Sequence, residues 1–93
     1  MSVYRRAKDP QALLDYGFDW STWLGTDTIA SSTWVVSGED ALLSVESSSH
    51  SSSGTTVWLS GGTLGVSYAV TNHIVTADGR EDDRTMEINI ADK

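Results

Sequence analysis

Two side chains in this 93-residue chain, those of His50 and His73, normally titrate near neutral pH and offer general acid or base chemistry. His50 lies within the serine tract at residues 47–53, where flexibility would oppose the preorganisation that catalysis requires. His73 falls on the expected outward face of a strand. Serines are numerous, but no Gly-x-Ser-x-Gly motif exposes one as a nucleophile. A Ser/His/Asp site assembled in space is the remaining alternative, and we expect no enzyme.

An acidic segment at residues 78–84 carries four carboxylates that offer calcium oxygen ligands: Asp78, Glu81, Asp82 and Asp83. Their spacing is not that of an EF-hand, and Arg80 and Arg84 partly neutralise them. We interpret the segment as a solvated hairpin tip. The glycines within residues 61–65 lack the lysine of a P-loop, and the absence of cysteine removes thiolate ligands and disulfides. We therefore expect no metal, no cofactor and no small-molecule substrate.

The net charge of −7 and the sequence pI of about 4.4 disfavour binding to nucleic acid, whose phosphates would be repelled. No apolar run approaches the ~20 residues of a membrane helix, so no membrane association is expected. Met1 to Asp9 does not resemble a secretory signal, which implies synthesis in the cytoplasm. Arg5, Arg6 and Lys8 make residues 1–10 basic and predict an extended arm that reaches an acidic partner; a solvated, mobile terminus is the alternative.

Abundant Thr, Val, Ile and Trp, with a single proline, predict an all-β fold for one domain at residues 11–93. Strands are expected within residues 13–18 and at residues 29–36, 42–46 and 55–59, with two long strands after residue 65. Turn signals separate these runs and include the serine tract. Short strands at such spacing favour an antiparallel sandwich or a barrel over alternating βαβ units, and of these we expect the sandwich. Val57 and Leu59 share a face that excludes Trp58.

The last two strands show the clearest alternation, and its parity limits the turn between them. Even positions from Val66 to Ile74 are apolar except for Asn72, and those from Met86 to Ile90 are all apolar. Paired residues share a face, so a two-residue turn at Asp78 and Gly79 would set apolar residues against charged ones. We therefore predict a three-residue loop of Asp78, Gly79 and Arg80, or a two-residue turn followed by a bulge. Either arrangement places Val70 opposite Ile88 and Tyr68 opposite Ile90.

Aromatic residues carry two further predictions. Tyr68 follows a glycine-rich stretch that ends at Gly65, and it fits the tyrosine corner of immunoglobulin-like sandwiches; an ordinary half-buried aromatic is the alternative. Trp20, Trp23 and Trp58 offer large apolar surfaces with one donor each, as interface anchors do. The alternative places all four tryptophans in the core. We expect at least one to be reserved for a partner.

An ordered set of residues over nearly the whole chain resembles small tailed-bacteriophage virion proteins of the fiber-tail adaptor type. The first part comprises Lys8, Asp9, Pro10, Leu14, Asp15, Tyr16, Phe18, Asp19, Trp20, Trp23, Leu24, Asp27, Thr28, Ile29 and Trp34. The second comprises Val57, Trp58, Leu59, Ser60, Gly61, Gly62, Thr63, Gly65, Tyr68, Val70, Thr71, Asn72, Thr76, Gly79, Arg80, Asp82, Arg84 and Ile88. The sequence departs from the family pattern at the serine tract, which is longer here.

The resemblance implies an immunoglobulin-like sandwich, present in several copies in the virion, that links a tail or connector ring to fibers or neighbouring tail proteins without catalysis. Docking is expected through the arm and through Trp20, Trp23 and Trp58, and deleting residues 2–8 should prevent incorporation while leaving the domain folded. Two alternatives stay open. One is a carbohydrate-binding or adhesive surface domain, and the other is a head-to-tail joining or capsid-decorating protein.

Overall fold

Strands make up most of the chain, as the β-branched and aromatic composition predicted. The computed structural model describes residues 4–92. In chain order the elements are β1 (Tyr4–Lys8), β2 (Leu14–Asp19), α1 (Ser21–Leu24), β3 (Ile29–Ser37), β4 (Leu43–His50), β5 (Gly54–Gly61), β6 (Ser67–Thr76) and β7 (Glu81–Ile90). None of the helices in this described part is long and apolar enough to cross a membrane.

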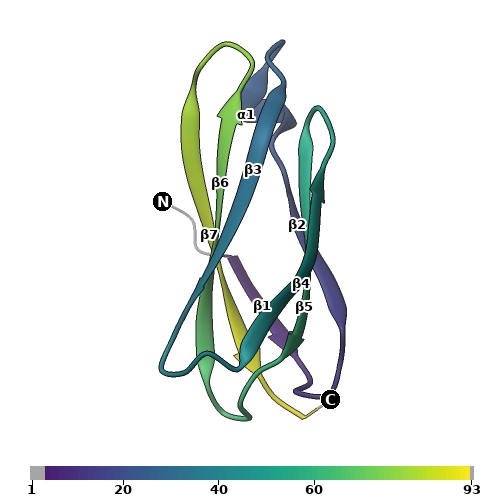
Figure 1. Ribbon diagram of the computed structural model, residues 1–93, viewed down its shortest axis with the longest axis vertical. Coiled ribbons are helices and arrows are strands. Elements are labelled where there is room, and N and C mark those ends of the chain that lie inside the picture. Colours follow the sequence, from purple (N-terminus) through teal and green to yellow (C-terminus); the bar gives the residue numbers. More distant parts are fainter. Residues whose placement is uncertain (1–3, 93) are drawn as a thin grey trace.

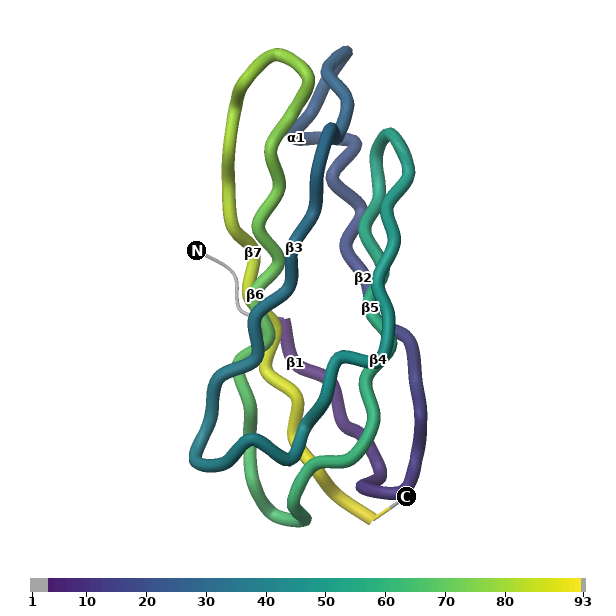
Figure 2. The backbone as a smooth tube through the Cα atoms, viewed as in Figure 1, coloured from purple at the N-terminus to yellow at the C-terminus, as the bar shows by residue number. Residues whose placement is uncertain are grey.

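The strands form two packed sheets, which confirms the predicted sandwich. One sheet has four strands in the order β1-β7-β6-β3, and the other has three in the order β2-β5-β4. Figures 1 and 2 show the two layers side by side along the long axis of the molecule. A constant-type immunoglobulin sandwich places its first strand in one sheet with the second, fourth and fifth, whereas here β1 lies in the sheet that does not contain β2, β4 and β5. The immunoglobulin-like assignment beyond the sandwich itself stays a prediction.

The core fills the space between the sheets with the side chains that alternation assigned to it. It comprises Phe18, Trp20, Leu24, Ile29, Leu43, Val57, Leu59, Tyr68, Val70, Ile74, Met86, Ile88 and Ile90. Val57 and Leu59 are fully buried while Trp58 between them is 40% exposed, so the predicted facing of this strand is confirmed. Each fully buried aliphatic side chain contributes about 1.5–3 kcal/mol to the free energy of folding.

The predicted N-terminal arm is, over Tyr4–Lys8, a strand of the larger sheet. β1 pairs in parallel with β7 from Tyr4 opposite Met86 to Lys8 opposite Ile90. Residues 1–3 of the expected arm lie outside the described residues. The free arm over residues 4–8 was therefore a wrong prediction, because backbone pairing with β7 holds the segment whatever its charge. The basic side chains of this segment led to its interpretation as a free arm, although it forms a strand.

The β6–β7 hairpin keeps the predicted parity but not the predicted pairs. Tyr68 lies opposite Ile88 and Val70 opposite Met86, two residues away from the expected partners. The loop has three residues, Ala77 to Gly79, since the Thr76 amide donates to the Arg80 carbonyl at 2.8 Å. Gly79 is the last loop residue and has φ of 87°, a left-handed conformation that favours glycine. That requirement sets the turn one residue earlier than predicted and leaves Arg80 outside it.

The serine tract is not a flexible loop over most of its length. β4 extends through Ser47 to His50 and pairs with β5, and only residues 51–53 turn. The Ser51 hydroxyl closes this turn by accepting from the Gly54 amide at 3.0 Å. Serine was interpreted as a turn former, but here hydrogen bonding to a neighbouring strand outweighs that preference.

Candidate partner-binding surfaces

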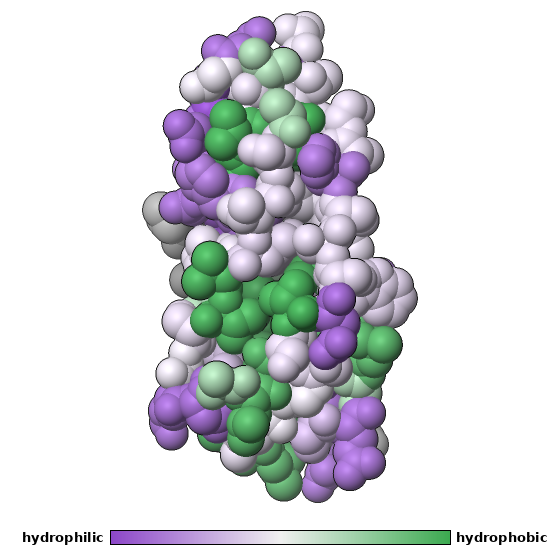
Figure 3. All heavy atoms as spheres, viewed as in Figure 1, coloured by the Kyte–Doolittle hydropathy of each residue, from purple (hydrophilic) through white to green (hydrophobic). Residues whose placement is uncertain are grey.

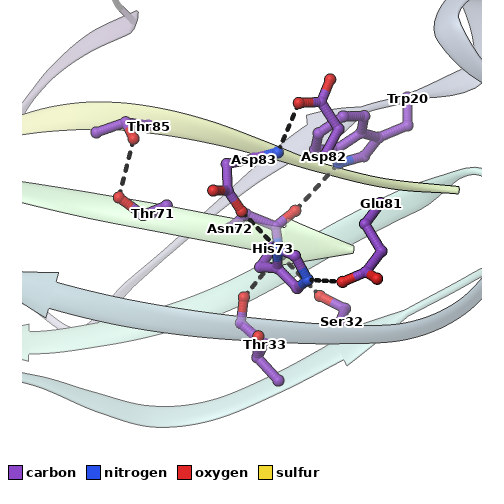
Figure 4. A network of polar contacts seen from close by, with 10 residues as sticks. All are labelled: Trp20, Ser32, Thr33, Thr71, Asn72, His73, Glu81, Asp82, Asp83 and Thr85. Atoms are coloured by element: carbon purple, nitrogen blue, oxygen red, sulfur yellow. Dashed lines mark hydrogen bonds and ion pairs between the residues drawn. The ribbon is translucent and has the colours of Figure 1, made fainter. Parts of the chain in front are cut away.

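Trp20 belongs to the core, so its prediction as an exposed anchor was wrong. Its side chain is 0% exposed, and its indole Nε1 donates to Asn72 Oδ1 at 3.0 Å. The Arg84 guanidinium covers the ring at 4.0 Å from its centroid. Trp20 lies between β2 and α1, and its backbone amide donates to the Ser53 carbonyl at 2.8 Å. Figure 4 shows Trp20 and Asn72 pointing toward each other between the strands.

Trp23 is half-buried in α1 and is held by Arg80. The Arg80 guanidinium lies 4.4 Å from the Trp23 ring centroid, and its Nη2 donates to the Leu24 carbonyl at 2.9 Å. Its Nε donates to the Asp27 carboxylate at 3.1 Å. Hydrogen bonds from Thr76, then from Thr28, Arg80 and Asp78, lower the pKa of Asp27 to about 2. Arg80 therefore joins α1 to the β6–β7 hairpin, which leaves only part of Trp23 for a partner.

Trp58 is the one predicted tryptophan anchor that projects outward. It lies on β5 in the centre of the smaller sheet, opposite Asp15 of β2 on one side and Ser47 of β4 on the other. With 40% of its surface exposed, it is a large apolar side chain on an otherwise polar face. Such an isolated aromatic among small polar residues has the character of an interface anchor.

The basic residues of β1 divide into two exposed side chains and one buried one. Arg5 and Arg6 are exposed, and Arg5 lies 3.7 Å from Glu87 of β7. Lys8 is 0% exposed, and its ammonium donates to the carbonyls of Gly61 at 2.8 Å and Asp9 at 2.9 Å. Burial lowers the pKa of Lys8, and the nearby Asp9 carboxylate opposes this effect. Lys8 fastens β1 to the end of β5, so its prediction as a partner contact was wrong.

The predicted contacts do not form one surface. Trp58 faces outward from the three-stranded sheet, whereas Arg5 lies on the outer face of the four-stranded sheet beside Glu87. The short helix α1, which carries Trp23, lies toward the opposite end of the molecule from β1, as Figure 1 shows. Any partner that contacted Trp58 and a partner that contacted β1 would therefore approach from different directions.

Two carboxylates of the acidic segment 78–84, those of Glu81 and Asp83, contact His73 of β6. The His73 Nδ1 lies 2.5 Å from Asp83 and its Nε2 lies 2.9 Å from Glu81 (Figure 4). Asp83 and then Glu81 raise the pKa of His73 above its ordinary value. Among the described residues no group of three His, Cys, Asp or Glu side chains is arranged to hold a metal ion. The carboxylates favour an imidazolium on the outer face of the hairpin.

Tyr68 makes the bond expected of a tyrosine corner, together with one that sequence reasoning missed. Its hydroxyl accepts from the Thr63 amide at 3.0 Å, and Gly65 in the same turn has φ of 84°. The hydroxyl also donates to Asp40 Oδ1 at 2.6 Å. Tyr68, followed by the Leu42 amide and Thr63, lowers the pKa of Asp40. This corner therefore ties the β5–β6 connection to the β3–β4 connection.

An exposed apolar patch, not predicted from the sequence, lies where β3 and β4 approach each other. Its members are Val35 of β3 and Leu42 of the following connection, each 62% exposed, and Val45 of β4, 40% exposed. Figure 3 shows apolar side chains gathered over this part of the molecule. The signal was available in the consecutive valines Val35 and Val36, because neighbouring strand residues face opposite sides and one must point outward.

A family model described as "Podophage GP4 fiber-tail adaptor protein gp77" matches residues 8–89 of the chain. The match runs from the last residue of β1 almost to the end of β7, so it covers nearly the whole sandwich. Comparison with curated proteins gives no match.

Proposed function

This chain belongs to the podophage fiber-tail adaptor family, and from that premise we propose that it is a non-catalytic protein that joins a fiber to the tail or its connector ring. The family resemblance predicted from the sequence is thereby confirmed. The family match carries the proposal. Of the two histidines, His73 is engaged by two carboxylates, and His50 is exposed at the end of β4.

Separate surfaces support the adaptor role, because a linker must contact at least two neighbours at once. Trp58 offers an aromatic anchor on the smaller sheet, and Arg5 and Arg6 offer cations beside the larger one. The arginines stand out on a chain of net charge −7 and suit an acidic neighbour. We assign Trp58 and the two arginines to different partners.

Several copies in one virion would strengthen the linkage. Contacts that are individually weak become strong when they are held in a ring, because each later contact forms at a high effective concentration. A small domain without disulfides also gains stability when a partner binds only its folded form.

The test is production of particles from a phage genome that lacks this gene, followed by electron microscopy. We expect intact tails without fibers, and recovery of fibers when the wild-type protein is supplied. Trp58→Ala should bind these particles more weakly and should stay folded with only a modest fall in melting temperature, because 40% of the side chain is exposed. Thr56→Ala, on the same strand and face, is the matched control. Normal fiber attachment in the absence of the protein would contradict the adaptor role.

A further inference from the structure

The four edge strands of the sandwich differ in how they are protected against pairing with another chain. Natural proteins protect such edges with charges, bulges or short strands. β1 has five residues and carries Arg5 and Arg6, and β2 carries Asp15 and Asp19. β4 carries Glu46 as the extra residue of a register shift between Val45 and Ser47. Three of the four edges are therefore protected.

β3 has none of these protections over most of its length. It is a nine-residue edge strand with no charged residue and no proline. Its pairing with β6 is in continuous register from Ser31 to Ser37, and the only shift lies before Ser31. The free side of β3 therefore presents a row of backbone donors and acceptors that can pair with a further strand.

Side chains on both sides of this edge suit a strand partner. Val35 projects from the outer face at 62% exposure, and Val45 of β4 in the other sheet is 40% exposed. Trp34, on β3 itself, has the one buried side-chain nitrogen or oxygen atom among residues 4–92 without a hydrogen-bond partner, its Nε1. The apolar patch and the open backbone thus coincide.

We propose that the edge of β3 receives an extended segment of a partner tail protein as a fifth strand of the larger sheet, an inference that rests on the adaptor function. The occupant is uncharged along the stretch that pairs with residues 31–37, to match the side chains of β3. It carries basic residues beside that stretch, because Glu39 and Asp40 follow β3 and the chain has a net charge of −7. A second copy of the chain would bring two acidic molecules together and is the less favoured occupant.

The test uses particles made without the protein and measures how tightly the recombinant full-length chain binds to them. The variant Thr33→Lys/Val35→Lys places two charges on exposed positions of the β3 edge. The control Ser67→Lys/Thr85→Lys places two charges on exposed positions of the same sheet face, on the inner strands β6 and β7. All three proteins should have similar melting temperatures, because every substituted side chain is exposed.

We expect the β3 variant to bind about tenfold more weakly or worse, the change produced by ~1.4 kcal/mol, with the control close to wild type. Hydrogen exchange should show that amides in residues 31–37 gain protection when the wild-type chain is bound. An equal loss of binding in the β3 variant and the control variant would mean that the partner docks on the sheet face, and this would overturn the proposal. Binding of the wild-type chain without added hydrogen-exchange protection in residues 31–37 would also overturn it. A wild-type dimer that the β3 variant abolishes would identify a second copy as the occupant and also overturn it. Failure of the wild-type chain to restore fibers would instead refute the adaptor function.

Discussion

Asn72 shows how a single polar residue can fix the relation between two sheets. It lies on β6 with 0% exposure, and its Oδ1 accepts from Trp20 Nε1 at 3.0 Å and from the Thr55 hydroxyl at 2.7 Å. Its Nδ2 donates to the Ser32 hydroxyl at 2.9 Å and to the Thr33 carbonyl at 3.0 Å. These partners come from both sheets and from the approach to α1. A buried polar group that is fully satisfied in this way specifies one packing arrangement.

Asn72→Ala should therefore cost about 2–5 kcal/mol of folding free energy, because two buried donors, Trp20 Nε1 and the Thr55 hydroxyl, lose their acceptor. Urea denaturation measures this loss. The neighbouring Thr71→Ala removes a partly exposed bond to Thr85 and should change stability by roughly 0.5 kcal/mol or less. A similar effect of the two substitutions would show that the buried network does not stabilise the sandwich.

A second prediction concerns His73 and the dependence of protein stability on pH. Its folded-state pKa is raised by Asp83 and then by Glu81, so the folded state holds the proton more tightly than the unfolded state does. The stabilisation is complete below the ordinary value near 6.5 and is lost as pH rises through the raised folded pKa. The wild-type melting temperature should thus fall as the pH is raised through this window. The melting temperature of His73→Gln should stay constant over the same pH range. An equal fall in the melting temperatures of both proteins would exclude His73 as the cause.

The β6–β7 hairpin shows what alternation in a sequence determines and what it does not. Alternation has a period of two residues, so it identifies the inward face of each strand and rejects an odd shift. A shift by two residues keeps every side chain on its face, and the pattern alone cannot detect it. The true register follows from Gly79, whose left-handed φ of 87° ends the three-residue loop. The positive φ required at Gly79 therefore selects the hairpin register, which hydrophobic periodicity alone does not determine.

Gly79→Ala should test that account directly. No atom lies within 4 Å of the position that an added Cβ would occupy, so the cost is conformational and amounts to about 1–2 kcal/mol. Gly54→Ala is the matched control, because Gly54 does not have a positive φ and an added Cβ would approach Phe18 O at an ordinary 3.6 Å. We expect no loss, or a small gain, in the control. Equal thermal unfolding of wild type and Gly79→Ala would contradict this explanation of the register.

Across the molecule, the sequence predicted the layers better than the surfaces. The inward sets of β5, β6 and β7 follow from alternation, and so does the outward position of Trp58. Trp20 could not be placed, because it lies between a strand and a helix where neither periodicity applies. Lys8 could not be placed either, since its burial depends on carbonyls at Gly61 and Asp9 that only the folded chain brings within reach. Surface assignments depend on such long-range contacts.

The position of β1 changes how docking through the basic residues must be tested. Deleting residues 2–8 would also remove the strand that pairs with β7, so the deletion would confound docking with folding. Arg5→Ser/Arg6→Ser keeps the backbone of β1 and the buried Lys8, and it should leave the melting temperature nearly unchanged because both side chains are exposed.

If the arginines meet an acidic neighbour, this double variant should bind particles more weakly, and its binding should respond less to added salt than that of the wild type. Screening acts only on the charges that remain, so removing two cations flattens the salt dependence. The control Asp78→Ser/Asp82→Ser removes two exposed charges of the opposite sign from the β6–β7 hairpin, and its binding should stay close to that of the wild type. If the arginine variant binds with the same strength and salt dependence as the wild type, β1 is excluded as a cationic docking strand. The partner would then be sought at Trp58 and at the open edge of β3.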